Sequence, residues 1–211
     1  MQKDRANAYQ DAAFAQVLRI GKAVSNLTRL KIIFILDQGK KSVEEIAKAI
    51  GISVGTTSKN LQLLKQVNLV KEEKDKNFVF YALANPQVSQ LFSLLISLAE
   101  SSLPEMQSLE ENFEVVPKIT LNQLKGKELT GTYILDLRPK DEFANQHLPH
   151  AHNIPFNEID FKNLPFKNDE DVVVYCRGRL CGIAEVVGKE LKNHGYQKVK
   201  VLNQSVSELK N

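Results

Sequence analysis

The segment from residue 172 to residue 191 constrains the fold of this chain more than any other. It opens with the run Val172-Val173-Val174-Tyr175, which is rich in β-branched residues and is typical of a buried parallel strand. A short loop with one glycine and two arginines follows, and residues 182–191 have the pattern of a helix. This order predicts an α/β domain with a parallel sheet.

Both cysteines of the chain, Cys176 and Cys181, lie in this loop. The loop brings backbone N–H groups, a helix start and the charges of two arginines around one sulfur, which favours the thiolate. We therefore expect Cys176 to be the catalytic nucleophile. The expected active-site loop is Arg177, Gly178, Arg179, Leu180 and Cys181. The alternatives are an inert, buried Cys176 and a Cys181 that only packs at the helix start.

A second motif lies upstream, where residues 134–139 form Ile134-Leu135-Asp136-Leu137-Arg138-Pro139. It continues through Glu142-Phe143 and through His147-Leu148-Pro149-His150-Ala151-His152-Asn153-Ile154-Pro155. With the cysteine loop, these segments resemble the rhodanese (sulfurtransferase) domains over roughly residues 115–209. Gln146 and His150 replace glycines of that family pattern. Residues 202–209 lack its Gly-Gly and Trp, which predicts an altered loop at the pocket.

The other polar residues of this half indicate a functional role less strongly than the two cysteines do. We expect Arg138 to pair with Asp136 or Glu142 and to brace the strand end, a supporting role. His147, His150 and His152 suggest a metal site, and an extended backbone would put His150 and His152 on one face. No third acidic or cysteine ligand is nearby. We therefore expect no metal and no cofactor.

The 211 residues are enough for two small domains, and their charge is unevenly divided. Residues 1–84 have a net charge of +6 and residues 85–211 a net charge of −3. This split indicates that only the first half meets a polyanion. No apolar stretch is long enough for a signal peptide or a membrane span, so we expect no membrane partner. Two cysteines do not make a disulfide framework, so we expect a reducing cytoplasm.

The first half has the pattern of a helix-turn-helix. An apolar helix over residues 24–36 precedes a second helix that Ser42 and Glu45 start as a capping box. Gly51 makes the turn, and Ser53 starts a third helix that reaches about Val67. Its outer face carries small and polar side chains, as contact with bases and phosphates requires. The expected DNA-binding residues of this helix are Ser53, Gly55, Thr56, Ser58, Lys59 and Gln62.

Two alternating segments, 69–74 and 78–83, follow around Asp75-Lys76-Asn77 and predict a hairpin, the wing of a winged helix. Lys74 and Lys76 complete the expected DNA contacts, although solvated charge alone explains them too. The segment from Ser25 to Ile32, the recognition helix and the wing together resemble the ArsR family of dimeric bacterial repressors over roughly residues 10–100. That family often senses metals through cysteines in its DNA-binding domain, and this chain has none there.

The helix from Val88 to Ala99 is apolar nearly all round. A small domain cannot cover every side of it, so we expect part of it to form a homodimer interface with the first helix, which carries Phe14, Val17 and Leu18. The alternative is a helix buried between two domains. The expected organisation is a winged helix-turn-helix domain of the α+β class at 1–100, a linker at 101–117 with a short acidic helix over residues 105–114, and an α/β rhodanese-like domain at 118–211.

Two functions remain open. In the first, the chain is a DNA-binding transcriptional regulator, expected to be a repressor, whose rhodanese half senses sulfane sulfur through a Cys176 persulfide. A small anionic donor would be attracted by Arg177 and Arg179. In the second, the chain is a sulfurtransferase with an accessory DNA-binding domain. A phosphatase is disfavoured because Cys-x5-Arg is absent: residue 182 is glycine.

Overall fold

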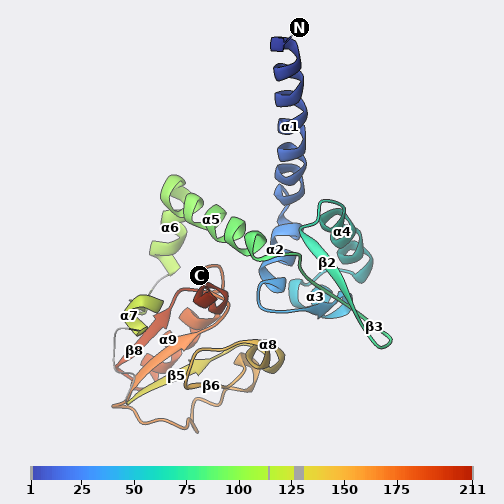
Figure 1. Cartoon of the computed structure of the whole chain (residues 1–211). Coiled ribbons are helices and arrows are strands. Elements are labelled where there is room, and N and C mark those ends of the chain that lie inside the picture. Colours follow the sequence, from blue (N-terminus) through green and yellow to red (C-terminus); the bar gives the residue numbers. More distant parts are fainter. Residues whose placement is uncertain (1, 114, 126–130, 211) are drawn as a thin grey trace. The chain divides into compact units, whose positions relative to one another are not determined.

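The computed structural model describes residues 2–113, 115–125 and 131–210, and the chain divides into two compact units at residues 97 and 98 (Figure 1). The first contains α1 (Gln2–Val24), α2 (Leu27–Leu36), β1 (Lys41–Ser42), α3 (Val43–Ile50), α4 (Val54–Gln66), β2 (Val70–Asp75), β3 (Phe78–Leu83) and most of α5 (Pro86–Ser102). Its three strands form an antiparallel sheet in the order β1-β3-β2. The predicted helix-turn-helix and wing are therefore present.

The helix starts of this unit follow from local sequence. Ser42 and Glu45 form the predicted capping box at α3, and Gly51 ends that helix with a φ of 71° in the left-handed region. Such a conformation favours glycine, which has no Cβ to clash with the backbone. Ser53 caps α4 by accepting a hydrogen bond from the N–H of Thr56. The turn between α3 and α4 is thus determined by two capping residues, Gly51 at the end of α3 and Ser53 at the start of α4.

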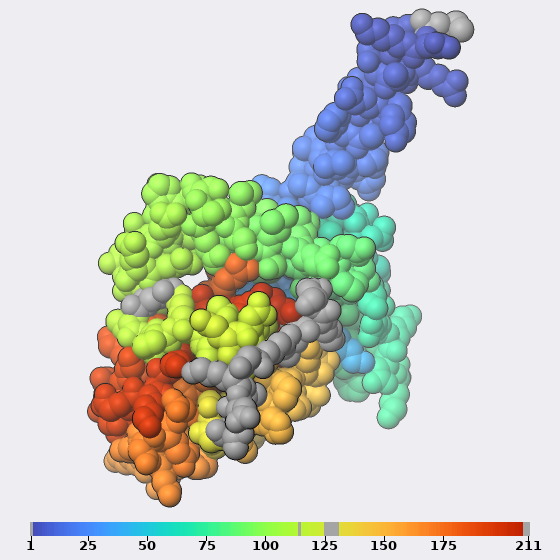
Figure 2. Space-filling view, turned by 60° about the vertical axis from the view of Figure 1, so that its left-hand side comes forward, coloured from blue at the N-terminus to red at the C-terminus, as the bar shows by residue number. Residues whose placement is uncertain are grey.

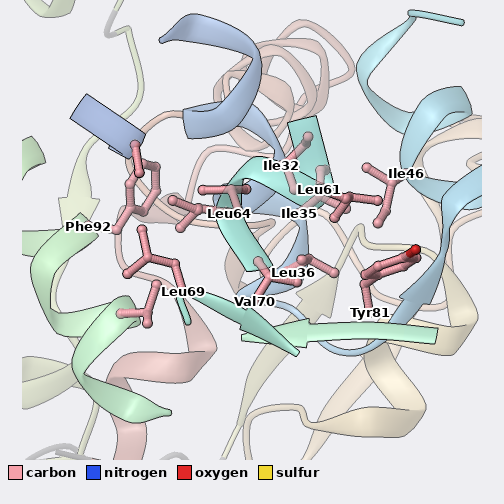
Figure 3. Close-up of a cluster of buried hydrophobic side chains, with 13 residues drawn as sticks. Ile32, Ile35, Leu36, Ile46, Leu61, Leu64, Leu69, Val70, Tyr81 and Phe92 are labelled. Carbon is pink, nitrogen blue, oxygen red and sulfur yellow. The ribbon is translucent and has the colours of Figure 1, made fainter. Parts of the chain in front are cut away.

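The core of the first unit determines which side of the recognition helix α4 is buried. Leu61 and Leu64 of α4 are fully buried and pack with side chains from α2 and α3, and Thr57 on the same side is also fully buried. Figure 3 shows these leucines among Ile32, Ile35, Leu36, Ile46, Leu69, Val70, Tyr81 and Phe92. Burying one side of α4 leaves its opposite side directed away from the core.

The second unit is built around a sheet of five parallel strands in the order β4-β8-β7-β5-β6 (Figure 1). Its elements are the end of α5, α6 (Pro104–Phe113), β4 (Lys118–Ile119), α7 (Leu121–Lys125), β5 (Thr132–Asp136), α8 (Lys140–Asn145), β6 (Ala151–Asn153), η1 (Phe156–Glu158), β7 (Asp171–Tyr175), α9 (Ile183–Asn193), β8 (Val199–Leu202) and η2 (Val206–Lys210). The predicted α/β fold with a parallel sheet is confirmed.

The central strand β7 is buried on both faces, which explains its unbroken apolar run. Val172 and Val174 belong to one apolar cluster with Val187 and Leu191 of α9. Val173 and Tyr175 belong to a second cluster on the other face of the sheet. The cysteine loop therefore starts from the best-covered strand of the unit.

Two further expectations are settled by the backbone. The segment expected to be a linker, 101–117, contains the helix α6, while Glu114 lies outside the described residues. His150 has a φ of 60°, and β6 starts only at Ala151. His150 and His152 therefore do not share one face of an extended strand. A left-handed φ also explains why the family pattern has glycine at His150. Among the described residues, no helix is long and apolar enough to cross a membrane.

Candidate functional site

The two cysteines lie face to face at the end of β7. Their Sγ atoms are 2.9 Å apart, since the loop turns back so that the N–H of Cys181 donates to the carbonyl of Gly178. Gly178 has a φ of 96°, and a Cβ there would lie 2.7 Å from the backbone nitrogen of Ser205. Glycine is therefore required where residues 204 and 205 pass over the loop. The predicted loop residues are brought together as expected.

The charge of the pair differs from the sequence prediction. Cys176 is 2% exposed, whereas Cys181 is partly exposed. The interaction with Cys181 and burial raise the pKa of Cys176 well above its usual value. The hydrogen bond with Cys176 and the backbone N–H groups of Arg177 and Ile183 lower the pKa of Cys181 to about 6, against the effect of burial. These directions favour Cys181 over Cys176 as the thiolate of the pair, whereas the sequence pattern favoured Cys176.

Both loop arginines are held by carboxylates. Arg177 binds Glu142 through Nε and Nη2, with Nη2 lying 2.8 Å from Oε1, and Glu142 is almost fully buried. Nη1 of Arg179 lies 2.8 Å from Oε2 of Glu100, near the end of α5. The predicted attraction of an anionic donor by these arginines is therefore not supported, because each charge is already neutralised. The partners lie 35 and 79 residues away in sequence, and no local pattern indicates them.

The supporting residues occupy the predicted position. Nη2 of Arg138 lies 2.6 Å from Oδ2 of Asp136, and both side chains are almost fully buried. Arg138 also donates to the carbonyl of Gln146. The Arg138 guanidinium lies over the ring of Tyr175, at 5.5 Å from its centroid. Burial raises the pKa of Tyr175, whose hydroxyl accepts a hydrogen bond from the N–H of Leu148. The prediction that Arg138 pairs with Asp136 is confirmed.

A cavity of about 480 Å³ opens beside the two sulfurs. Its walls are the cysteine loop, the start of α9, β8 and the helix α6, which lies within the expected linker segment. The apolar side chains among its lining residues are Met106, Leu109, Phe113, Leu180, Ala184, Val201 and Leu202. A volume of this size is typical of small-molecule sites. A short helix was expected in this segment, but its place beside the cysteines was not; the helical spacing of Met106, Leu109 and Phe113 is the sequence signal for its apolar side.

The predicted DNA-binding residues lie on the outer side of α4 and on the hairpin. Gly55, Lys59 and Gln62 are exposed, and Ser58 is partly exposed. Ser53 and Thr56 are exposed too, but their hydroxyls hydrogen-bond to each other at 2.9 Å, so both shape the helix start. Lys74 and Lys76 are exposed on the β2–β3 hairpin. Among the described residues, no group of three His, Cys, Asp or Glu side chains is arranged to hold a metal.

Comparisons with known proteins agree with this arrangement. The family model described as "Bacterial regulatory protein, arsR family" matches residues 26–72, and the model described as "Rhodanese-like domain" matches residues 117–211. The first match covers α2 to the start of β2. The second covers the whole parallel sheet and the cysteine loop.

Several relatives extend these matches. The HTH-type transcriptional regulator Rv0324 of Mycobacterium tuberculosis is 34% identical over 201 residues, covering 90% of this chain and 87% of the relative. The putative sulfur carrier protein YrkF of Bacillus subtilis is 27% identical over 92 residues, covering 42% of this chain and 48% of that protein. A solved homodimeric winged helix-turn-helix domain of Mb0332 from Mycobacterium bovis is 38% identical, covers 46% of this chain and 89% of that domain, and superposes with a TM-score of 0.43. The chain belongs to the ArsR family of winged helix-turn-helix transcriptional regulators and carries a C-terminal rhodanese-like domain.

Proposed function

We propose that this regulator binds double-stranded DNA as a homodimeric repressor and senses sulfane sulfur through its Cys176–Cys181 pair. The observation that carries the proposal is the 2.9 Å separation of the two Sγ atoms. A disulfide needs about 2.05 Å between its sulfurs, so the bond requires only a small movement of the loop. A sulfur taken up by either cysteine is therefore within reach of the other. One relative, YrkF of Bacillus subtilis, is named a putative sulfur carrier protein, which agrees with such chemistry.

The pKa values and exposures favour Cys181 as the first sulfur to react, in place of the Cys176 expected from sequence. The Cys181 thiolate attacks the outer sulfur of a persulfide donor R–S–SH. A new S–S bond forms on Cys181, the S–S bond of the donor breaks, and R–S⁻ leaves and takes up a proton. Attack by Cys176 on the outer sulfur passes that sulfur on, giving the Cys176 persulfide that the sequence predicted.

Either persulfide collapses to the same product. The free cysteine attacks the inner sulfur of the other, the Cys176–Cys181 disulfide forms, and the outer sulfur leaves as hydrosulfide with the proton of the attacking thiol. Two thiols are thereby oxidised to one disulfide, and the sulfane sulfur is reduced to sulfide. The reaction removes the thiolate charge from the loop that holds Arg177 and Arg179. We propose that this local change in charge alters the affinity of the protein for DNA.

The DNA side of the proposal is supported by the exposed face of α4 and by Lys74 and Lys76 on the wing. We infer that the dimer binds a palindromic site with half-sites about one helical turn apart. Dimerisation is assigned to the apolar side chains that α1 and α5 leave exposed, because large exposed apolar patches mark interaction surfaces. They are Phe14, Val17, Leu18, Leu94 and Leu98. A cytoplasmic location is part of the proposal, since free cysteines persist in a reducing compartment.

The deciding experiment combines mass spectrometry with DNA-binding measurements on the reduced full-length protein and its own promoter. Polysulfide should convert the cysteine pair to the disulfide and weaken DNA binding at least tenfold, about 1.4 kcal/mol. Cys176→Ser should keep a stable persulfide on Cys181, the cysteine that reacts first, and lose the DNA response, because no second thiol is left to form the disulfide. Multiple turnovers of sulfur transfer without any change in DNA affinity would instead support the sulfurtransferase enzyme with an accessory DNA-binding domain.

A further inference from the structure

The helix α6 is built into the second unit as a wall of the cysteine cavity. At its N-terminal end, Nε2 of Gln107 donates to the carbonyl of Glu100 at 3.2 Å. Just beyond its C-terminal end, the N–H groups of Val115 and Val116 both donate to Oε1 of Glu185, with Val116 at 2.6 Å. Glu185 is buried and belongs to α9. These contacts tie α6 to the end of α5 and to α9, the helix that follows the cysteine loop.

The apolar side of α6 faces the cysteine loop. A Cβ built on Gly182 would lie 2.6 Å from Cζ of Phe113, so the phenyl ring occupies the space that any other residue at 182 would need. Met106, Leu109 and Phe113 follow one another at helical spacing and all line the cavity. Figure 2 shows the yellow-green residues of α6 exposed on the surface of the molecule. The cavity thus has an apolar wall beside two reactive sulfurs.

The charged groups that line the cavity balance one another. They are two acids and two bases, namely Glu110, Glu185, Lys118 and Arg179. Arg179 is paired with Glu100, and Glu185 accepts the two backbone hydrogen bonds described above. Burial lowers the pKa of Lys118, which disfavours its charged form. The cavity therefore offers a dianion such as thiosulfate no net positive charge to compensate for its desolvation.

We propose that this cavity binds the uncharged, apolar body of an organic persulfide, R–S–SH, and holds its outer sulfur toward the cysteine pair. The proposal rests on the proposed function, because the same two cysteines take up the sulfur. It ranks the donors by rate: at equal concentration, small anions such as thiosulfate and polysulfide react more slowly than hydrophobic persulfides, so polysulfide must be used in excess. Burial of a hydrocarbon group of ring size against Leu109 and Phe113 supplies the binding energy.

The test compares two probes with the same sulfur chemistry, benzyl persulfide and 4-carboxybenzyl persulfide. The reduced full-length protein is mixed with each near neutral pH, and mass spectrometry measures the second-order rate constant for loss of free thiols. The carboxylated probe should react at least about tenfold more slowly with the wild type, because its charge is desolvated in the cavity.

Two variants with similar exposure test whether the cavity wall causes the difference in rate between the two probes. Leu109 is 67% exposed and lines the cavity, so Leu109→Lys should fold normally and place a cation at the wall. We expect it to bring the ratio of the two rate constants close to one. Leu103 is 51% exposed and is not a lining residue, so Leu103→Lys should leave the ratio unchanged.

Failure of this inference is distinct from failure of the proposed function. Equal rates for both probes with the wild type, while polysulfide still forms the disulfide, would overturn the apolar cavity alone. An unchanged ratio in Leu109→Lys would do the same. Absence of any cysteine modification by either probe and by polysulfide would overturn the sensing function, and this inference with it.

Discussion

Nη1 of Arg179 lies 2.8 Å from Oε2 of Glu100, which ties the cysteine loop to the last turns of α5. The two side chains are 15% and 20% exposed, so the ion pair is largely shielded from solvent. The helix α5 starts at Pro86 in the first unit and ends at Ser102 in the second. Glu100 belongs to the second unit, so the pair joins the cysteine loop to the part of α5 that lies within the same unit.

The first prediction concerns this connection. Glu100→Gln removes the negative charge that pairs with Arg179. The weaker contact means that a rearrangement of the cysteine loop should displace α5 less. Disulfide formation with polysulfide should stay within about twofold of wild type, while the ratio of DNA dissociation constants with and without polysulfide should fall from about tenfold toward one. Glu105→Gln, at an exposed position in the first turn of α6, is the control. A full response in Glu100→Gln would show that this ion pair carries no signal.

The second prediction concerns the pH dependence of Cys181. Its pKa is lowered to about 6, so the thiolate is present above that pH and disappears as the pH falls through it. Alkylation by iodoacetamide should therefore rise between about pH 5 and 7 and then level off, whereas an ordinary cysteine keeps rising past about pH 8.5. Peptide mass spectrometry should find Cys181 alkylated before Cys176.

The control for this prediction removes the main cause of the low pKa. Cys176→Ala eliminates the hydrogen bond to Cys181, so the pKa of Cys181 should move up and its alkylation at pH 7 should slow. Faster modification of Cys176 than of Cys181 in the wild type would contradict the assignment of the thiolate.

The third prediction concerns DNA binding by the recognition helix. Lys59 is exposed on α4, and Lys59→Ala should weaken binding to every DNA sequence. The slope of log K against log salt should become shallower by about 0.9 for each phosphate that the variant no longer neutralises. Lys189→Ala, at an exposed position of α9 in the rhodanese-like domain, should leave both quantities unchanged. Fluorescence anisotropy over a series of salt concentrations measures the slope. Identical slopes for Lys59→Ala and wild type would remove Lys59 from the interface.

The fourth prediction concerns the dimer. Leu94 is 66% exposed on α5, so Leu94→Asp should fold normally and disrupt an apolar interface between two copies. Sedimentation or light scattering at micromolar concentration should show a monomer for this variant and a dimer for the wild type. Phe78 at the hairpin is equally exposed, and Phe78→Asp should remain dimeric. A dimeric Leu94→Asp would place the interface elsewhere.

The fifth prediction concerns stability of the second unit. Asp136→Ala leaves the Arg138 charge buried without its carboxylate partner. This should lower the free energy of unfolding by about 3–5 kcal/mol. Denaturant titration followed by a signal specific to this unit should show that decrease. The control is Asp160→Ala at an exposed position, which should lower the free energy of unfolding by less than about 1 kcal/mol. A small decrease for Asp136→Ala would mean that the ion pair adds no net stability to the strand end.

The helix-turn-helix, the wing, β7 and α9 followed from the sequence because their causes are local. Apolar periodicity and the caps at Ser42, Gly51 and Ser53 specify the helix-turn-helix. An unbroken β-branched run specifies β7, since both of its faces are buried. The pairing of Arg138 with Asp136 was predictable because the two residues are only two positions apart.

Other features were decided by the tertiary structure. Glu142 and Glu100 lie 35 and 79 residues from the arginines that they neutralise, and no local pattern encodes those pairs. The position of α6 beside the cysteines depends on Glu185 and on the absence of a side chain at Gly182. The location of the thiolate depends on burial and on a second sulfur 2.9 Å away, because a pKa responds to distance and solvation in three dimensions. Sequence alone determined the two folds and the cysteine pair, whereas their packing decided which thiol has the lower pKa and what surrounds it.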